Sequence, residues 1–320
     1  MTTLSVFNDQ QKAQAKRLLA TSVARMMGRK FEEGDWASVY CAAKEIPDQG
    51  WSNLHIDVMH QGLGVEHKML CVGGDKPLMS LAGTSQMHPS ATRSIRIDST
   101  DASATDAMVS VFSQYGELIR QRTQRVKDDA NGLEPDMRIG WLLWERSLTE
   151  FIYFEEPMTA PDPDHYWAEW NERAARGARK GSKNLWIYER GTDKKKYSVT
   201  TSAGVKIQPY FDVPAPNDPN LNFFRVQSEP VGQTHVRIWV AQNTAKRLRE
   251  ILDDAELSSL SDEIVEAAKT EVDATVIVGE LVELAEPILI SKDAHAILTS
   301  RWSGVSDEHR VQLLIQSLLA

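Results

Sequence analysis

The sequence predicts an α/β protein, in which a mixed sheet flanked by helices is followed by a β-rich second half. Three observations carry this prediction. Apolar residues recur at helical spacing near the N-terminus, an alternating hairpin pattern follows them, and short strand patterns crowd the second half. The chain has 320 residues, of which 42% are hydrophobic and 25% charged. That composition is typical of a folded protein, and the length allows a sizeable core.

Two helices are expected at the start of the chain. The first covers residues 10–30, where the apolar positions at helical spacing are Ala15, Leu18, Leu19, Val23, Met26 and Met27. The second covers Asp35–Lys44, with Asp35 as its N-cap and Pro47 beyond its end.

A β-hairpin is expected next. Residues Asn53–His60 alternate between apolar and polar side chains, and Leu63–Val72 reads as a second, mostly apolar strand. Gln61-Gly62 supplies the turn between them, because glycine favours tight hairpin turns.

The remaining pattern divides into helices and strands on either side of Met158–Pro163. Before it come a helix over Thr105–Lys127 and a hairpin over 137–157; after it comes a helix over 164–180. Short strands fill Leu185–Val240, and further helices are expected at Thr244–Leu252, Ser261–Thr270 and Ser306–Leu319. We therefore divide the chain into a hairpin-containing unit, 1–160, and a β-rich unit with an acidic helical end, 161–320.

Charge is unevenly distributed along the chain. The net charge is −9, yet Arg173–Lys206 holds 10 basic and 2 acidic residues, and Glu250–Ala320 holds 15 acidic and 4 basic residues. This asymmetry indicates one basic face and an acidic remainder, although solvated surface charge remains the plain alternative. The two cysteines form no CxxC pair, and the sequence has neither a signal core nor an apolar run of roughly 20 residues. We therefore expect a cytoplasmic protein without a membrane partner.

The chemistry is concentrated in the hairpin segment HIDVMHQGLGVEHKML. Glu66 and Lys68 are two residues apart on one strand, so they face the same side, and the tight turn brings Asp57 back beside Glu66. Two adjacent carboxylates repel each other and favour a cation between them, and Mg²⁺ suits such hard oxygen ligands. Lys68 can neutralise phosphate charge, or act on a water molecule if the site lowers its pKa.

Several alternatives stay open at this point. The pattern D-x8-E-x-K is weak by itself, and the hairpin could be a solvent-exposed face with an ordinary Glu–Lys pair. His55, His60 and His67 lie near the hairpin, but their spacing matches no zinc site. No nucleotide-binding glycine loop or nucleophile elbow is present in the sequence. Most of the nine tryptophans are expected in the core, although one could stack on an unpaired base.

The helix followed by Asp57 on one strand and Glu66-His67-Lys68 on the next resembles the PD-(D/E)XK nuclease superfamily, and within it the type II restriction endonucleases. The resemblance covers about residues 10–130 and implies a restriction-endonuclease-like fold. It implies Asp57 and Glu66 as Mg²⁺ ligands, the His67 carbonyl as a further ligand, and Lys68 as the catalytic lysine. Two positions depart from the pattern, since Ile56 replaces a proline and His67 stands where apolar residues are frequent. Members often add a helix glutamate, for which Glu32, Glu33 and Glu45 are candidates and Glu45 is preferred.

The sequence thus predicts a Mg²⁺-dependent, site-specific endonuclease that cuts double-stranded DNA. A homodimer is expected if the target is palindromic, because two-fold sites match two-fold proteins. The basic middle region would contact phosphates, with Gln208 and Thr200 available to base edges. The expected DNA-contacting residues are Arg176, Arg179, Lys180, Lys183, Lys194, Lys195, Lys196 and Gln208. The alternatives are a non-catalytic DNA-binding or assembly protein and a nuclease of repair or transposition.

Overall fold

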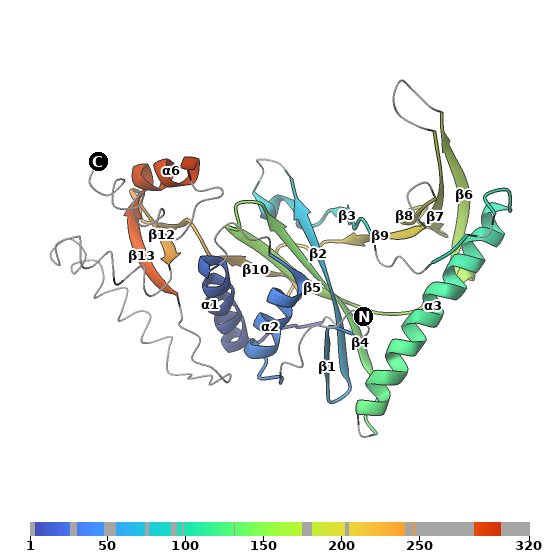
Figure 1. Cartoon of the computed structure of the whole chain (residues 1–320), viewed down its shortest axis with the longest axis horizontal. Coiled ribbons are helices and arrows are strands. Elements are labelled where there is room, and N and C mark those ends of the chain that lie inside the picture. Colours follow the sequence, from blue (N-terminus) through green and yellow to red (C-terminus); the bar gives the residue numbers. More distant parts are fainter. Residues whose placement is uncertain are drawn as a thin grey trace.

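The computed structural model describes most of the chain, with gaps (Figure 1). The described residues are 4–25, 31–47, 56–73, 77–90, 95–97, 99–130, 132–174, 181–201, 205–240, 246 and 285–301. They form helices and three separate sheets, which confirms the predicted α/β class. None of the described helices is long and apolar enough to cross a membrane.

The first sheet is mixed and has the strand order β1-β2-β4-β5-β10. Its strands β2 and β4 are parallel, whereas the other neighbours are antiparallel. The strands are β1 (Val58–His60), β2 (Leu63–Val72), β4 (Asp136–Glu145), β5 (Glu150–Pro157) and β10 (Asn222–Arg225). The hairpin expected over 137–157 is confirmed as β4–β5.

Helices flank this sheet on both faces. Figure 1 shows α1 (Asp9–Arg25) and α2 (Glu33–Ala43) beside each other, and the long α3 (Ala104–Asp129) running apart from them. Helix α3 joins the parallel strands β2 and β4, which require a crossover connection. The helices expected over 10–30, Asp35–Lys44 and Thr105–Lys127 are confirmed as α1, α2 and α3, apart from 26–30, which lie outside the described residues.

The start of α2 differs from the expectation that Asp35 is its N-cap. Glu32 is the N-cap, and Asp35 stands at the third helical position, where the two side chains form a reciprocal capping box. The Asp35 carboxylate accepts a hydrogen bond from the Glu32 amide over 2.9 Å. The helix therefore begins two residues earlier than expected. Glu32 can act as the N-cap because its side chain and that of Asp35 each accept a hydrogen bond from the other residue's backbone amide.

The hairpin expected over Asn53–Val72 is present, with a shorter first strand. The turn residues Gln61 and Gly62 have φ of 46° and 84°, as a two-residue hairpin turn requires. Strand β1 begins at Val58 rather than Asn53, and residues 53–55 lie outside the described residues. Gly64 lies where α3 crosses β2: a Cβ there would be 2.6 Å from Val126 Cγ2. Only glycine allows this close approach.

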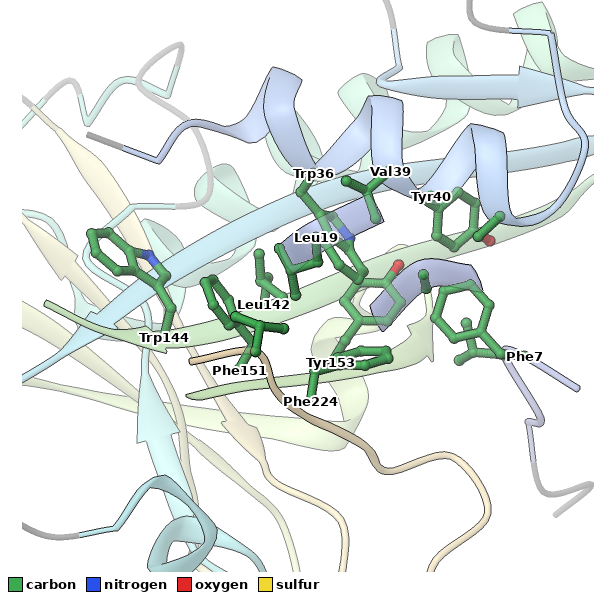
Figure 2. Packing of buried hydrophobic residues seen from close by; sticks show 14 of the residues in the cluster. Phe7, Leu19, Trp36, Val39, Tyr40, Leu142, Trp144, Phe151, Tyr153 and Phe224 are labelled. Carbon is green, nitrogen blue, oxygen red and sulfur yellow. The ribbon is translucent and has the colours of Figure 1, made fainter. Parts of the chain in front are cut away.

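The face of the sheet under α1 and α2 carries an aromatic core (Figure 2). Trp36 and Tyr153 lie with ring centroids 4.7 Å apart, and Tyr40, Phe7 and Phe224 pack around them. Burying each such side chain contributes about 1.5–3 kcal/mol, so this cluster holds the helices firmly against the sheet. The position of β2 is thereby fixed from the side opposite to α3.

The second sheet is antiparallel and has the order β3-β9-β8-β7-β6. It packs one face against α3 through Leu185, Ile187 and Val199, which share a buried cluster with Phe112. Its strands are β3 (Ser85–Met87), β6 (Tyr166–Arg173), β7 (Ser182–Glu189), β8 (Lys195–Thr200) and β9 (Lys206–Asp212). This sheet confirms the β-rich pattern after Leu185.

The prediction of a helix over 164–180 is wrong for the residues that the structure describes. A 3₁₀ turn, η2 (Pro163–His165), leads instead into β6, and 175–180 lie outside the described residues. Alternate residues of β6, among them Tyr166 and Trp170, pack toward α3, while Trp167 points to the other face. Large aromatic side chains favour strands, and here the two-residue period outweighs the helical reading.

A third sheet holds β11 (Glu229–Val231), β12 (His235–Val240) and β13 (Glu286–Ser291), followed by α6 (Lys292–Arg301). A short 3₁₀ helix, η1 (Leu78–Leu81), follows β2. The helices expected at Ser261–Thr270 and Ser306–Leu319 lie outside the described residues, as does that at Thr244–Leu252 apart from Lys246.

The chain does not separate cleanly between 160 and 161. Strand β10, from the second half, pairs with β5 and completes the first sheet. Strand β3, from the first half, pairs with β9 in the second sheet. Each half of the chain therefore contributes a strand to the sheet of the other.

Candidate active site

Asp57 and Glu66 meet where the hairpin pairing ends. The last paired residues in the register are Val58 and Val65, so Asp57 lies opposite Glu66. The sequence predicted that Asp57 lies within the first strand of the hairpin. In the structure it immediately precedes that strand, β1. Its Oδ2 accepts a hydrogen bond from the His67 amide at 2.6 Å, in place of a main-chain partner. The side chain thus extends the hairpin and is held beside β2.

Glu66 is buried and shared between two cations. Its Oε1 accepts a hydrogen bond from Lys68 Nζ at 2.8 Å and lies 3.1 Å from Arg122 Nη2 of α3. Its Oε2 is buried and has no hydrogen-bond partner among the described residues. An unsatisfied carboxylate oxygen is costly in a protein interior, so this oxygen marks a position for a further ligand.

Lys68 is held by three oxygens as a charged group. Its Nζ donates to Glu66 Oε1 and, over 3.0 Å, to the carbonyl oxygen of His67, and it lies 4.0 Å from Glu33 Oε1. Burial lowers the pKa of Lys68, but the carboxylates of Glu66 and Glu33 outweigh burial and raise it overall. The condition for Lys68 to act as a base, a lowered pKa, is therefore not met, and the geometry favours a cationic role.

Asp57 has an unusual affinity for a proton. Burial and the nearby charge of Glu66 raise the pKa of Asp57 to about 7, although Lys68 and the amide of His67 oppose the shift. Two carboxylates so close together share a single proton or a cation more readily than they stay doubly charged. The site is therefore arranged to receive positive charge.

The glutamate of α2 that lies beside the candidate site is Glu33, whereas the sequence had favoured Glu45. Glu33 is the first residue of α2 and lies beside Lys68. Glu45 follows the opposite end of that helix, is exposed, and has a positive φ of 57°. The direction of α2 decides between them, because a helix of 11 residues separates its ends by roughly 15 Å.

Arg122 is the site residue that the sequence reasoning missed. It lies on α3 between the buried residues Ile119 and Val126, three and four positions away. Positions three or four apart share one helix face, so a basic residue within this apolar stripe was the available signal. Its side chain is 31% exposed, which leaves it able to contact a ligand as well as Glu66.

His67 turns its side chain away from the carboxylates. The ring is fully buried against Tyr40 and Tyr153, and its Nδ1 lies 3.3 Å from the Tyr153 hydroxyl. Burial, assisted by Lys68, lowers the pKa of His67 to about 3, so the ring is neutral. Gly140 lies opposite on β4, where a Cβ would be 2.8 Å from His67 Nδ1. Only the carbonyl of His67 therefore faces the site.

The expected DNA-contacting residues that are described lie on the second sheet or its turns. Arg176, Arg179 and Lys180 lie outside the described residues. Lys183 forms a 2.9 Å ion pair with Glu172, whereas Lys194 and Lys196 lie 4.0 and 3.5 Å from Asp212. Lys195 covers the ring of Trp186, and Gln208 Nε2 donates to the carbonyl of Pro89 over 3.0 Å. The structure does not bring these residues to Asp57 and Glu66.

No protein-family model, curated protein or solved structure matches this chain. Among the described residues, no group of three or more His, Cys, Asp or Glu side chains is arranged to hold a metal ion. The candidate site instead offers two carboxylates and one main-chain carbonyl, those of Asp57, Glu66 and His67. Cations that keep several water ligands need no more than one or two carboxylates from the protein.

Proposed function

We propose that the chain is a Mg²⁺-dependent endonuclease that hydrolyses phosphodiester bonds of double-stranded DNA. The observation that carries the proposal is the pairing of half-buried Asp57 with buried Glu66 across the hairpin, with Lys68 on the same side of β2. A merely structural hairpin gains nothing from two facing carboxylates, whose burial is costly. The resemblance to the PD-(D/E)XK pattern rests on the same three residues and agrees with this geometry.

The donor set fits a hard divalent cation. Glu66 Oε2 has no partner among the described residues, and burial together with the nearby charge of Glu66 raises the pKa of Asp57. The ligands would be these two carboxylates and the carbonyl oxygen of His67, with water and phosphate oxygens completing the shell. A bound Mg²⁺ would polarise a phosphate oxygen and lower the pKa of a water ligand.

The chain's own cations supply the rest of the chemistry. Lys68 remains protonated because its pKa is raised, so its ammonium can hold a phosphate oxygen as negative charge develops. Arg122 approaches the same carboxylate from α3 and can bind a second phosphate oxygen through its planar guanidinium. Asp57, fixed by the His67 amide, keeps its position when the substrate enters.

The deciding experiment is cleavage of phage DNA by the purified full chain. We expect cutting with Mg²⁺, none in EDTA, and binding with little hydrolysis in Ca²⁺, because Ca²⁺ coordination is looser. Asp57→Asn serves as the control for a contaminating nuclease, since it keeps the side-chain shape and removes the charge. Cutting at the wild-type rate by Asp57→Asn, or in EDTA, would exclude the assigned site.

The finer proposal is a type II restriction endonuclease that acts as a cytoplasmic homodimer. Discrete fragments on the gel support site-specific cutting, whereas a smear supports a nuclease of repair or transposition. Binding without cutting in every metal supports a non-catalytic DNA-binding or assembly protein. Light scattering on the free and DNA-bound chain measures whether the active form is a dimer.

A further inference from the structure

The second sheet carries a row of aromatic side chains on the face turned away from α3. Trp167 of β6 and Tyr188 of β7 are cross-strand partners, and their rings stack 4.4 Å apart at an interplanar angle of 14°. Trp186 and Tyr210 continue the row on β7 and β9. We call these four rings, together with Lys195 of β8, the stacking face.

Lys195 lies at the centre of the stacking face. Its Nζ is 3.0 Å from the centroid of the Trp186 ring, 5.7 Å from that of Tyr188 and 5.9 Å from that of Tyr210. The ammonium therefore interacts with three rings drawn from two neighbouring strands. Each such contact is attractive because the ring face is electron-rich.

The stacking face is not part of the core. None of its four rings belongs to the buried clusters of the described residues, and all four are half-buried. The sheet packs on α3 through its other face, as Leu185 and Ile187 show. Four large, half-buried rings are thus gathered on one face of the sheet as the described residues form it, and a gathered apolar surface of this kind is typical of a binding site.

The polar edges of two rings are fixed in place. Trp167 Nε1 donates to Asp193 Oδ1 over 3.0 Å, and the Tyr188 hydroxyl donates to Glu169 Oε1 over 2.9 Å. These hydrogen bonds hold the rings in one orientation before any ligand arrives. A pre-oriented ring loses less side-chain freedom on binding, which favours affinity.

The charge around the stacking face is predominantly basic. Arg173 lies close enough to Lys195 to lower the pKa of that lysine, a shift in which burial is the larger cause. Lys206 lies on β9 across from Thr200, at the same end of the sheet as Arg173. Two carboxylates, those of Glu169 and Asp193, bind the polar edges of Tyr188 and Trp167, but the stretch Arg173–Lys206 as a whole has 10 basic and 2 acidic residues.

We propose that the stacking face binds an unpaired nucleic-acid strand, with bases on the aromatic rings and phosphates on Lys195, Arg173 and Lys206. Flat rings interleaved with cations are the chemistry that single strands require, whereas the bases of an intact duplex are already stacked on each other. A base that stacks on Trp186 displaces Lys195 from that ring and leaves its ammonium beside the adjoining phosphate. The proposal extends the proposed function, because it adds an unpaired segment to the substrates that the chain recognises.

The test is fluorescence anisotropy of a labelled oligothymidine of roughly 15 nucleotides, measured in EDTA so that no hydrolysis takes place. The variants are Trp186→Leu and Tyr188→Leu, which keep apolar volume and remove the ring. We expect each to bind at least about tenfold more weakly than wild type. The matched controls are Trp186→Phe and Tyr188→Phe, which keep a ring and should retain most of the affinity, with circular dichroism verifying the fold of all four.

Several outcomes overturn the proposal. Wild-type affinity in both leucine variants excludes stacking, as does equal loss in the leucine and phenylalanine variants. A third outcome is that a blunt duplex binds more tightly than the single strand and that all four variants lose this binding equally. That result would show only general attraction to phosphates. Failure of unlabelled oligothymidine to compete shows that the fluorescent label, and not the strand, is bound. Asp57→Asn should bind the strand normally, so failure of the cleavage proposal and failure of this one are distinguishable.

Discussion

Arg122 of α3 lies 3.1 Å from Glu66 on β2, so a helix distant in sequence closes the candidate site from above the sheet. The pair joins the carboxylate that the sequence predicted to a cation that it did not. Because Glu66 also binds Lys68, each cation can be drawn to a phosphate while the other still neutralises the carboxylate. In the proposed reaction, Arg122 therefore contacts the substrate in addition to stabilising the fold.

Replacing Arg122 tests that role. We expect Arg122→Ala to lower kcat by roughly 10- to 100-fold with a smaller change in KM, because the lost contact strengthens as charge develops on the phosphate. Arg122→Lys should recover only part of the rate, since lysine lacks the planar fork. The matched control is Arg120→Ala on the same helix, where Arg120 is exposed and pairs with Glu117. Equal rates in the Arg122 and Arg120 variants would show a surface role.

Glu66 of β2 and the two glutamates near the ends of α2, Glu33 and Glu45, should differ in their effect on cleavage. Glu66→Gln should abolish cutting and leave DNA binding intact, because it removes the charge that the cation requires. Glu33→Gln should reduce cutting partially, since Glu33 lies 4.0 Å from Lys68 and sets its charge. Glu45→Gln is the matched control and should cut at the wild-type rate. Initial rates on one plasmid substrate, with gel-shift affinities in Ca²⁺, compare the three variants.

The stability of the metal-free protein should depend on the titration of Asp57. Its pKa in the folded chain is about 7, above its ordinary value of 3.8. The stabilisation from a protonated Asp57 is therefore fully present below about pH 4 and is lost as the pH rises through about 7. Thermal unfolding in EDTA should show that Asp57→Asn loses less stability than wild type between about pH 5.5 and pH 8.5. Parallel curves for the two proteins would contradict the assigned titration.

The close approach of α3 to β2 should depend on Gly64. In Gly64→Ala, the new Cβ would lie 2.6 Å from Val126 Cγ2 and 2.8 Å from Met137 Sδ, so the helix has to move outward. We expect a loss of about 1–3 kcal/mol in the free energy of unfolding. Gly73→Ala is the control, because a Cβ at Gly73 meets no atom within 4 Å. Urea denaturation of both variants measures the difference.

The three consecutive lysines before and within β8 should govern the salt dependence of DNA binding. Replacing Lys194, Lys195 and Lys196 together by alanine should weaken binding to all sequences alike. Each lost phosphate contact removes roughly one unit from the slope of log affinity against log salt. Because Lys194 and Lys196 already lie near Asp212, the expected loss is smaller than three units. A slope and affinity unchanged from wild type would show that these lysines are only surface charge.

The sequence predicted the hairpin and its site because both depend on local patterns. The Gln61-Gly62 turn sets the register, and the register alone places Asp57 opposite Glu66. Arg122 could not be placed in the same way, because its position depends on how α3 packs over β2 across 56 positions in the chain. Packing between elements that are far apart in the chain leaves no periodic pattern in the local sequence.

Two further differences have local physical causes. Glu33 and Glu45 look equivalent in the sequence, and only the direction of α2 across the sheet distinguishes them. Over 164–180 the sequence pattern favoured a helix, but the aromatic residues of β6 gain more by packing against α3 on one face. Tertiary packing outweighs intrinsic preference at both places.

The pairing of β10 with β5 determines where the chain can be divided. A fragment ending near residue 160 would leave the whole outer edge of β5 open, and that edge includes the apolar residues Phe151 to Phe154. Open apolar edges recruit other strands, so such a fragment is prone to self-association during expression. A shortened chain that keeps the first sheet complete therefore has to retain at least Asn222–Arg225.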